Sequence, residues 1–329
     1  MNKNIDLQLF AGNPNTNTTT QTGSGQEMSP QMKIFYDKVI IKNAVPNLVH
    51  DQFGQKKPIP QGSGKTIEFR RLNPFAKTST PLTEGVTPDG KKLDWAKVTA
   101  TVNQYGDYVT TSDMLDMTAI DNNIAEAGRV LGDQAGLSLD SIVREILNAG
   151  TNVQYGNGSK SARSALTADD VLSVDAVRRA VTTLKRMNAK KINGDYVAII
   201  HPDVAYDLMS DPKWEAVATY NPKNLYTGEI GRLYGVRFVE TSEAKIFEKA
   251  GAGSINVYST LFLGADAYGT TSIEGGGLEM ITKNRGSAGT ADPLDQRSTI
   301  GWKATKTACI LTEAFMVRVE TGSKYPATA

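Results

Sequence analysis

The run Gly62-Ser63-Gly64-Lys65-Thr66 contains the residue types of a phosphate-binding loop. In such a loop, glycine amides, a lysine ammonium and a hydroxyl group together hold a nucleotide phosphate. The spacing excludes this site, because the motif requires a glycine five residues before Gly64, where Ile59 stands. The motif also requires a following helix, whereas the next residues alternate like a strand. The run Gly251-Ala252-Gly253 lacks the third glycine of a dinucleotide-binding loop.

The chain has two histidines, His50 and His201, which are too few for a His-rich metal site. Neither belongs to a recognisable catalytic arrangement. We expect the His201 ring to be hydrogen-bonded at the end of a predicted strand rather than catalytic. Asp113, Asp116 and Asp121 gather where a helix is predicted to start, and the helix dipole accounts for acids there. They lack the spacing of a calcium or zinc site, so no catalytic residue, cofactor or metal is expected.

Two groups of basic residues remain as candidate functional surfaces. The first lies between residues 54 and 77, is opposed there only by Glu68, and comprises Lys56, Lys57, Lys65, Arg70, Arg71 and Lys77. Its positive charge would orient the protein on an acidic neighbour, although lysines on edge strands also prevent stray pairing. The second group comprises Arg178, Arg179, Lys185, Arg186, Lys190 and Lys191. It indicates a solvated helix face, with phosphate contact as the alternative.

The composition is that of an ordinary folded chain, with 329 residues and a hydrophobic fraction of 40%. This length allows two lobes. The net charge of +1 gives no overall field toward DNA or anionic lipid, so any such binding must come from local patches. The single cysteine, Cys309, excludes an internal disulfide and suits a reducing cytoplasm. We find no signal-peptide core and no apolar run long enough to span a membrane.

The N-terminal stretch combines a short apolar hook, which contains Leu7, Leu9 and Phe10, with a polar tether at residues 12–30. The tether holds almost no apolar side chains and cannot fold alone. It leads to a predicted helix at residues 32–49. A partner could hold the hook in place, and the alternative is a frayed terminus.

Residues 65–72 and 97–111 alternate between apolar and polar side chains, which predicts two strands. Between them, residues 73–92 carry prolines and glycines among threonines and show no helical or strand pattern. Loops of this length are uncommon in compact domains and tend to be functional or disordered. The strands and the loop therefore predict a protruding basic hairpin arm. Because a two-stranded hairpin is marginally stable in water, the arm is expected to need a partner.

The strongest periodic signal predicts one helix from Asp113 to Ala149, capped by residues 111–113. At 1.5 Å per residue this helix would be roughly 55 Å long. Gly128, Gly132 and Gly136 lie inside it at intervals of four and form a ridge without side chains. Since glycine destabilises a helix, the ridge favours a closely packed neighbour or a bend.

The rest of the chain mixes helices and strands. We predict a helix that is capped by Thr167 and contains Val174 to Leu184, and a short helix from Pro202 to Met209. The predicted strands lie at residues 196–200, 236–241, 255–263, 278–283 and 307–320. The sequence therefore predicts an α+β fold.

Two stretches carry a resemblance to a known family. The opening Asp6-Leu7-Gln8-Leu9-Phe10-Ala11 resembles starts common among capsid-module proteins of phages of low-GC bacteria. Residues 196–208, followed by Asp211-Pro212-Lys213-Trp214, are similar to the coat protein family typified by coliphage N-four. Together with the order of the elements, the chain resembles the major capsid proteins of tailed phages, which have the Hong Kong 97-like fold.

The resemblance implies a division of the whole chain. It places an N-terminal arm at 1–33, an N-terminal helix region at 34–53, an extended β-hairpin loop at 54–110, a peripheral domain with a long spine helix at 111–164, mainly the axial domain at 165–270, and return strands that complete the peripheral domain at 271–329. The expected contacts between subunits involve the hook, the first basic group and the glycine ridge, which comprise Leu7, Leu9, Phe10, Lys56, Lys57, Lys65, Arg70, Arg71, Lys77, Gly128, Gly132 and Gly136.

The function implied by the resemblance is structural rather than enzymatic. Copies of the chain would form the hexamers and pentamers of an icosahedral shell around the double-stranded DNA of a tailed phage or prophage. The expected partners are other copies, a separate scaffold protein, a portal and non-specifically contacted DNA, with no membrane. The protein would reside in the virion and, during assembly, in the host cytoplasm. The alternatives are a nucleotide-dependent α/β enzyme built on residues 165–284, or another shell or tail component of a phage.

Overall fold

The computed structural model describes residues 16–17, 49–73, 75–118, 123–156, 158–214, 231–287, 289 and 292–325. The chain divides into two compact units, each built from three segments of the sequence. Unit 1 contains residues 1–52, 103–144 and 272–306, and unit 2 contains residues 53–102, 145–271 and 307–329. The predicted hook at Leu7, Leu9 and Phe10 lies outside the described residues, as does almost all of the helix predicted at 32–49.

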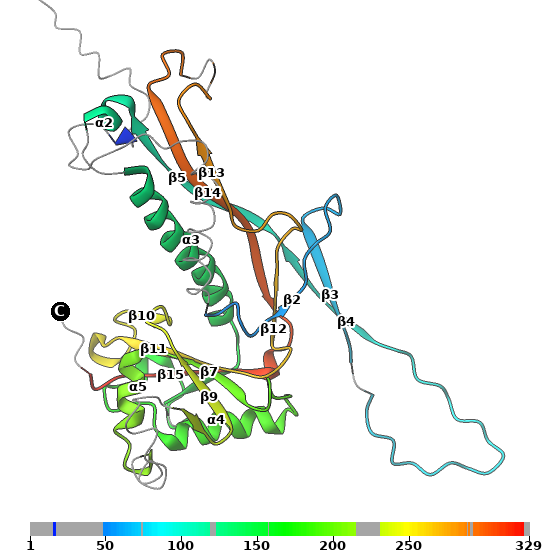
Figure 1. Ribbon diagram of the computed structural model, residues 1–329. Helices are drawn as coiled ribbons and strands as arrows, with labels where there is room; N and C mark the ends of the chain where they lie inside the picture. Colours follow the sequence, from blue (N-terminus) through cyan, green and yellow to red (C-terminus); the bar gives the residue numbers. More distant parts are fainter. Residues whose placement is uncertain are drawn as a thin grey trace, which may run out of the picture. The chain divides into compact units, whose positions relative to one another are not determined.

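Unit 1 contains a sheet in which β14 (Arg297–Ile310) has a neighbour on each side (Figure 1). Residues 297–306 of β14 pair antiparallel with β5 (Asn103–Ser112). The other edge of β14 pairs antiparallel with β13 (Glu279–Lys283). The two-residue strand β1 (Thr16–Asn17) runs parallel to β5.

Within the helix predicted from Asp113 to Ala149, the structure describes α2 (Asp113–Thr118) and α3 (Asn123–Asn148), and residues 119–122 lie outside the described part. Ser112 caps α2, because its Oγ accepts the N–H of Leu115 at 3.3 Å. Leu131, Ala135 and Leu139 recur every four residues on α3 and are buried. They pack with Ile300 and Trp302 of β14 in the core of this unit.

Unit 2 contains a seven-stranded sheet with two helices (Figure 1). Its strands follow the order β6 (Val153–Tyr155), β15 (Met316–Thr321), β11 (Val257–Leu263), β7 (Tyr196–Ile200), β9 (Val236–Glu240) and β8 (Arg232–Leu233), with β10 (Ile246–Phe247) also paired to β11. Every residue of β7, β11 and β15 is buried, so both faces of these strands are covered. The apolar face of α4 (Val174–Arg186) packs in the same core as β7 and α5 (Pro202–Met209).

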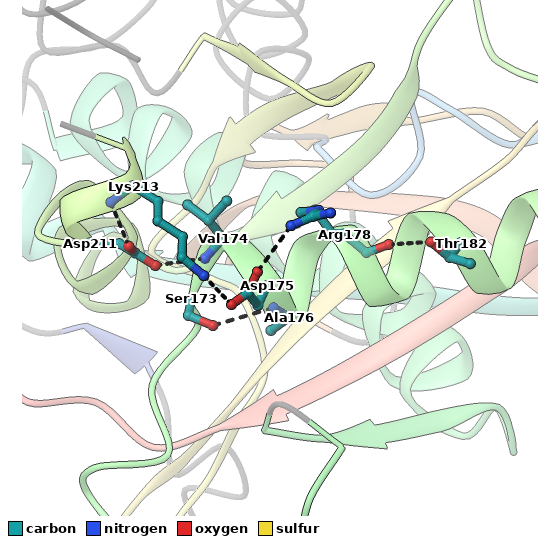
Figure 2. Close-up of polar contacts among 8 residues, drawn as sticks. All are labelled: Ser173, Val174, Asp175, Ala176, Arg178, Thr182, Asp211 and Lys213. Atoms are coloured by element: carbon teal, nitrogen blue, oxygen red, sulfur yellow. Dashed lines mark hydrogen bonds and ion pairs between the residues drawn. The ribbon is translucent and has the colours of Figure 1, made fainter. Parts of the chain in front are cut away.

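The N-terminus of α4 corrects the prediction that Thr167 caps this helix. The cap is Ser173, whose Oγ accepts the N–H of Ala176 at 3.3 Å (Figure 2). Thr167 instead donates its N–H and its hydroxyl to Asp170, at 2.8 and 2.9 Å. A second contact at the helix start comes from Asp211, which accepts the N–H of Val174 at 2.9 Å.

The predicted hairpin is present and forms a two-stranded sheet of its own in unit 2. Residue by residue, β3 (Thr66–Leu72) pairs antiparallel with β4 (Trp95–Thr101). The strand predicted at 97–111 is wrong in one respect, because it consists of two strands, β4 and β5, separated by the buried Val102. The Val102 N–H donates to the carbonyl of Lys65 at 2.8 Å, which closes the hairpin.

The strand predicted at 307–320 is also two strands. Residues 307–310 end β14 and pair antiparallel with β12 (Tyr268–Thr271), which in turn runs parallel to β2 (Gln55–Lys56). After the 3-10 turn Glu313–Phe315, β15 enters the seven-stranded sheet. The strands predicted at 196–200, 236–241, 255–263 and 278–283 and the helix from Pro202 to Met209 are confirmed to within two residues.

Candidate functional site: the hairpin and the pocket at its base

The base of the hairpin packs on the end of β14. Phe69 of β3 and Ala100 of β4 are each 6% exposed and contact Cys309, with Leu311 packed beside them. The packing is tight, because a Cβ added to Gly269 would lie 3.1 Å from the Phe69 ring. Burial of a phenylalanine contributes about 1.5 to 3 kcal/mol, so this contact stabilises a hairpin that would be marginal by itself.

The far end of the hairpin has no such cover. Every described residue from 75 to 95 is exposed. Six of the sixteen large apolar side chains exposed in the described residues lie between 72 and 95, namely Leu72, Phe75, Leu82, Val86, Leu93 and Trp95. A concentration of exposed apolar side chains, unlike single scattered ones, marks an interaction surface.

The hairpin loop (residues 73–94) nevertheless has defined contacts of its own. Where the loop leaves β3, the Asn73 amide donates to Asp94 at 2.6 Å. The Lys91 ammonium donates to the Thr78 hydroxyl at 2.8 Å and lies 6.0 Å from the centre of the Phe75 ring. These polar contacts give the loop a shape without an apolar core, and Figure 1 shows it extending away from β3 and β4.

All six residues of the first basic group are exposed. Arg70 pairs with Glu68 at 2.5 Å, and this hydrogen bond is the main reason why the pKa of Glu68 is lowered. Arg71 donates to the Thr312 hydroxyl at 2.9 Å. The Lys57 ammonium lies 5.7 Å from the centre of the Phe69 ring.

Three members of this group meet in a pocket at the base of the hairpin, here called the hairpin pocket. Its volume is about 320 Å³. It is lined by Gln55, Lys57, Phe69, Arg70, Arg71, Val98, Lys190, Asp266, Leu311, Thr312 and Phe315. Lys56, Lys65 and Lys77 are not among the lining residues. The sequence had placed Lys190 in the other basic group, and it gave no sign that Leu311 and Phe315 would form an apolar wall here.

The second basic group lies on and after α4, and all six of its residues are exposed. Arg178 bonds to Asp175 at 3.4 Å (Figure 2), and its guanidinium lies 5.6 Å from the centre of the Tyr234 ring. The Lys191 ammonium lies 5.8 Å from the centre of the Tyr196 ring. Lys190 lines the hairpin pocket and Arg179 lines a second pocket with Asn152 and Lys160. The other members of the group lie on a solvated face, as expected.

The three glycines of the predicted ridge all lie on α3. Gly128, Gly132 and Gly136 are all buried.

Both histidines have structural partners. The His201 Nδ1 accepts the N–H of Asp203 at 3.2 Å and caps α5, which confirms that its ring is hydrogen-bonded at the strand end. His50 is 1% exposed, and its Nδ1 lies 2.6 Å from Asp140 of α3. The His50 backbone N–H donates to the same carboxylate at 2.7 Å, so this pair holds residue 50 on the helix.

A strand, not a helix, follows Gly64, so the context of a phosphate-binding loop is missing. In the described part of the chain, no three His, Cys, Asp or Glu side chains gather where they could hold a metal ion. No helix among the described residues has both the length and the apolar character needed to cross a membrane.

Comparison with known proteins identifies what the chain is similar to. A family described as "Phage capsid protein" matches residues 96–319. The capsid protein of cyanophage Pam1 has a TM-score of 0.69 and 15% identity, over 93% of this chain and 96% of that one. The capsid of Ralstonia phage GP4 has a TM-score of 0.65 and 16% identity, over 85% of this chain and 90% of that one.

The capsid of cyanophage P-SCSP1u gives a TM-score of 0.65 and 13% identity, over 84% of this chain and 89% of that one. At these identities, the likeness shows the fold alone, a mixed α+β fold similar to the Hong Kong 97-like capsid proteins. None of the curated proteins compared with the chain matches its sequence.

Proposed function

The chain belongs to the phage capsid protein family, and from this premise we propose that it is the major capsid protein of a tailed phage or prophage, whose copies close an icosahedral shell around double-stranded DNA. The shell would consist of hexamers and pentamers of this chain. Membership of the family implies a structural, non-enzymatic role and a location in the virion capsid. Within the family, we propose that the chain belongs with the coliphage N-four type of coat protein.

The observation that carries the proposal is the uncovered apolar hairpin loop. Apolar surface removed from water contributes roughly 25 cal/mol per Å², so a single chain forgoes this stabilisation at Phe75, Leu82, Val86 and Leu93. Copies packed side by side in a shell would cover the same residues at every interface. Repetition of one such contact makes the whole shell stable even where each contact is modest.

The domain description extends the proposal to the rest of the chain. We propose that residues 1–33 form an N-terminal arm, that 54–110 form the extended loop and that α3 is part of a spine helix. The hook (Leu7, Leu9 and Phe10) and the first basic group would contact neighbouring subunits. The net charge of +1 is compatible with non-specific contact to packaged DNA.

Assembly would also need other phage proteins. We propose a separate scaffold protein and a portal as partners, and assembly in the host cytoplasm before the shell becomes part of the virion. These partners are inferred from the family resemblance rather than from a surface of this chain.

Replacement of the loop tests the proposal. Full-length protein would be produced with its candidate scaffold, fractionated by sedimentation and imaged by negative-stain electron microscopy. We expect closed shells of uniform diameter from the unchanged chain. A variant in which residues 75–93 are replaced by a short glycine-serine turn should fold, as judged by circular dichroism, but remain unassembled.

Met187→Ser provides a control, because Met187 is a 51% exposed apolar residue outside the hairpin and its replacement should leave assembly unchanged. Closed shells from the loop-replaced variant would refute the role given to the loop. A chain that stays monomeric with every scaffold, and whose residues 75–94 resist proteases, would refute the shell function itself.

A further inference from the structure

The hairpin loop and the hairpin pocket are chemically complementary. We propose that the loop tip of one subunit, residues 82–86, inserts into the hairpin pocket of a second copy of this chain. This inference rests on the proposed shell function, because it requires copies side by side. It adds a defined contact to that function, with a named segment and a named receiving site.

The pocket combines positive charge with an apolar wall. Lys57, Arg70, Arg71 and Lys190 contribute four cations, against the single carboxylate of Asp266. Phe69, Val98, Leu311 and Phe315 contribute the apolar wall. Its volume of about 320 Å³ is within the range of sites that hold a small ligand or a few side chains. Such a pocket is suited to a carboxylate flanked by apolar side chains.

The four cations of the pocket differ in the hydrogen bonds and ion pairs that they already make within the chain. Arg70 is paired with Glu68, and Arg71 donates one N–H to Thr312 while its guanidinium carries further donors. Lys190 and Lys57 have no acidic partner among the described residues, and Lys57 lies over the Phe69 ring. An incoming carboxylate would therefore find charge-assisted donors on two sides of the pocket.

The loop tip has the matching chemistry. The Val86 N–H donates to the Thr83 carbonyl at 3.2 Å, and Gly85 has a φ of +75°, which is the geometry of a turn that requires glycine at its third position. This turn places Glu84 at its apex. Leu82 and Val86, on either side, are 76% and 62% exposed. The tip is thus a carboxylate between two large apolar side chains.

The other carboxylates of the loop fit less well. Asp94 is already bonded to the Asn73 amide. Asp89 stands between Pro88 and Gly90, followed by two lysines, and lacks apolar neighbours. Asp94 also lies between exposed apolar side chains, Leu93 and Trp95, but its bond to Asn73 holds it where the loop joins the strands. Glu84 instead lies at a turn in the middle of the loop, with Leu82 and Val86 on either side. We therefore commit to the loop tip as the occupant of the pocket rather than to an acidic scaffold segment or to DNA.

The contact has a consequence for symmetry. Each subunit offers one tip and one pocket, so the contact can pass from each copy to the next around a ring or be exchanged between two copies. The proposed shell uses the first arrangement, in which the contact is heterologous and closes if the rotation between copies allows it. Twelve residues separate Leu72 from Glu84, and at about 3.3 Å per residue a tip can reach roughly 40 Å.

Cysteine pairing in trans tests the contact. Cys309→Ala would serve as the background, one protein would carry Glu84→Cys and a second, size-tagged protein would carry Lys190→Cys. The two would be mixed, assembled and mildly oxidised. We expect a disulfide between the two proteins in assembled shells and none before assembly. Lys185→Cys, at an exposed position of α4 outside the pocket, replaces Lys190→Cys in the control and should form no disulfide.

Each outcome bears on a different claim. Shells that form without a disulfide between positions 84 and 190, or with an equal yield for Lys185→Cys, overturn the inference and leave the shell function standing. Absence of shells with every protein counts against the shell function. A disulfide within one chain in the Glu84→Cys/Lys190→Cys double variant, without one between chains, assigns the tip to its own pocket and overturns the inference.

A charge exchange gives an independent readout. Glu84→Lys should raise the protein concentration needed for assembly by about tenfold, and adding Lys190→Glu should restore the original value. Unchanged assembly of Glu84→Lys, or an absence of rescue, overturns the inference. If Lys190→Glu changes assembly only when scaffold is present, or only in DNA-filled shells, the pocket binds scaffold or DNA. Either result also overturns the inference.

Discussion

Substitution of Phe69 by alanine should release the hairpin from the unit that carries it. Phe69 is 6% exposed and packs on Cys309, Gly269 and Leu311. Truncation of a buried phenylalanine costs about 3 to 5 kcal/mol. Because β3 and β4 pair only with each other among the described strands, this loss falls on a sheet that has little other support.

Hydrogen exchange measured by mass spectrometry would report the change. Since about 1.4 kcal/mol corresponds to a factor of ten, the amides of residues 66–72 and 95–101 should exchange about 100-fold faster or more in Phe69→Ala. The amides of β7 and β11, which lie in the seven-stranded sheet, should exchange at their original rates. Assembly should also weaken, because a loose hairpin must be ordered during each contact.

Phe75→Ala is the matched control, because Phe75 is 52% exposed and loses little packing. Its hairpin should exchange as slowly as that of the unchanged protein. Equal protection of the hairpin in Phe69→Ala and Phe75→Ala would refute the reasoning that packing at the base, rather than the pairing of β3 with β4, keeps the hairpin ordered.

Three further predictions concern buried groups of unit 2. Glu320 is fully buried and accepts two hydrogen bonds of 2.7 Å from Arg163, so Glu320→Gln should destabilise the unit by about 3 kcal/mol in a denaturant titration, and the double variant with Arg163→Gln should be less impaired than the single one. Burial raises the pKa of the Cys309 thiol from 9.0 to about 11. At pH 8, Cys309 should therefore react with a thiol reagent about 100-fold more slowly than in denatured protein, and equal rates would contradict its burial. Burial also raises the pKa of Asp207 above 3.8, so the folded state binds more protons, and this residue's contribution to stability should fall as the pH rises through that raised value. Asp207→Asn should remove this part of the pH dependence of the melting temperature.

Patterns of apolar residues determined several elements correctly. Alternation predicted β3, a continuous apolar run predicted β7, and the spacing of Val174, Val177 and Val181 predicted α4. These patterns work because side chains on the same face recur at every turn of a helix and at every second residue of a strand. A face that packs on the core therefore leaves a regular apolar spacing in the sequence, and a strand buried on both faces leaves a continuous apolar run. The exposure of the first basic group was likewise predictable, because charged side chains remain in water unless they are paired.

Changes of partner along a strand were not predictable. The alternation through Val98, Ala100 and Val102 predicted a single strand at residues 97–111, yet β4 pairs with β3 while β5 pairs with β14. Alternation reports which side of a strand is buried, and it carries no information about which strand lies beside it. The first part of β14 was not predicted, because Arg297-Ser298-Thr299 shows no alternation of apolar and polar side chains. In the structure this part of β14 pairs with β5 on one edge and β13 on the other.

The candidate functional residues were likewise predictable only where they are neighbours in the sequence. The sequence determined that a basic hairpin with a long loop rich in proline and glycine would exist, because those properties belong to neighbouring residues. Only the tertiary structure decided that Lys57 and Arg71 would share a pocket with Lys190, and that His50 would meet Asp140, ninety residues away. Such meetings depend on how whole elements pack, and no local pattern of side chains records that packing.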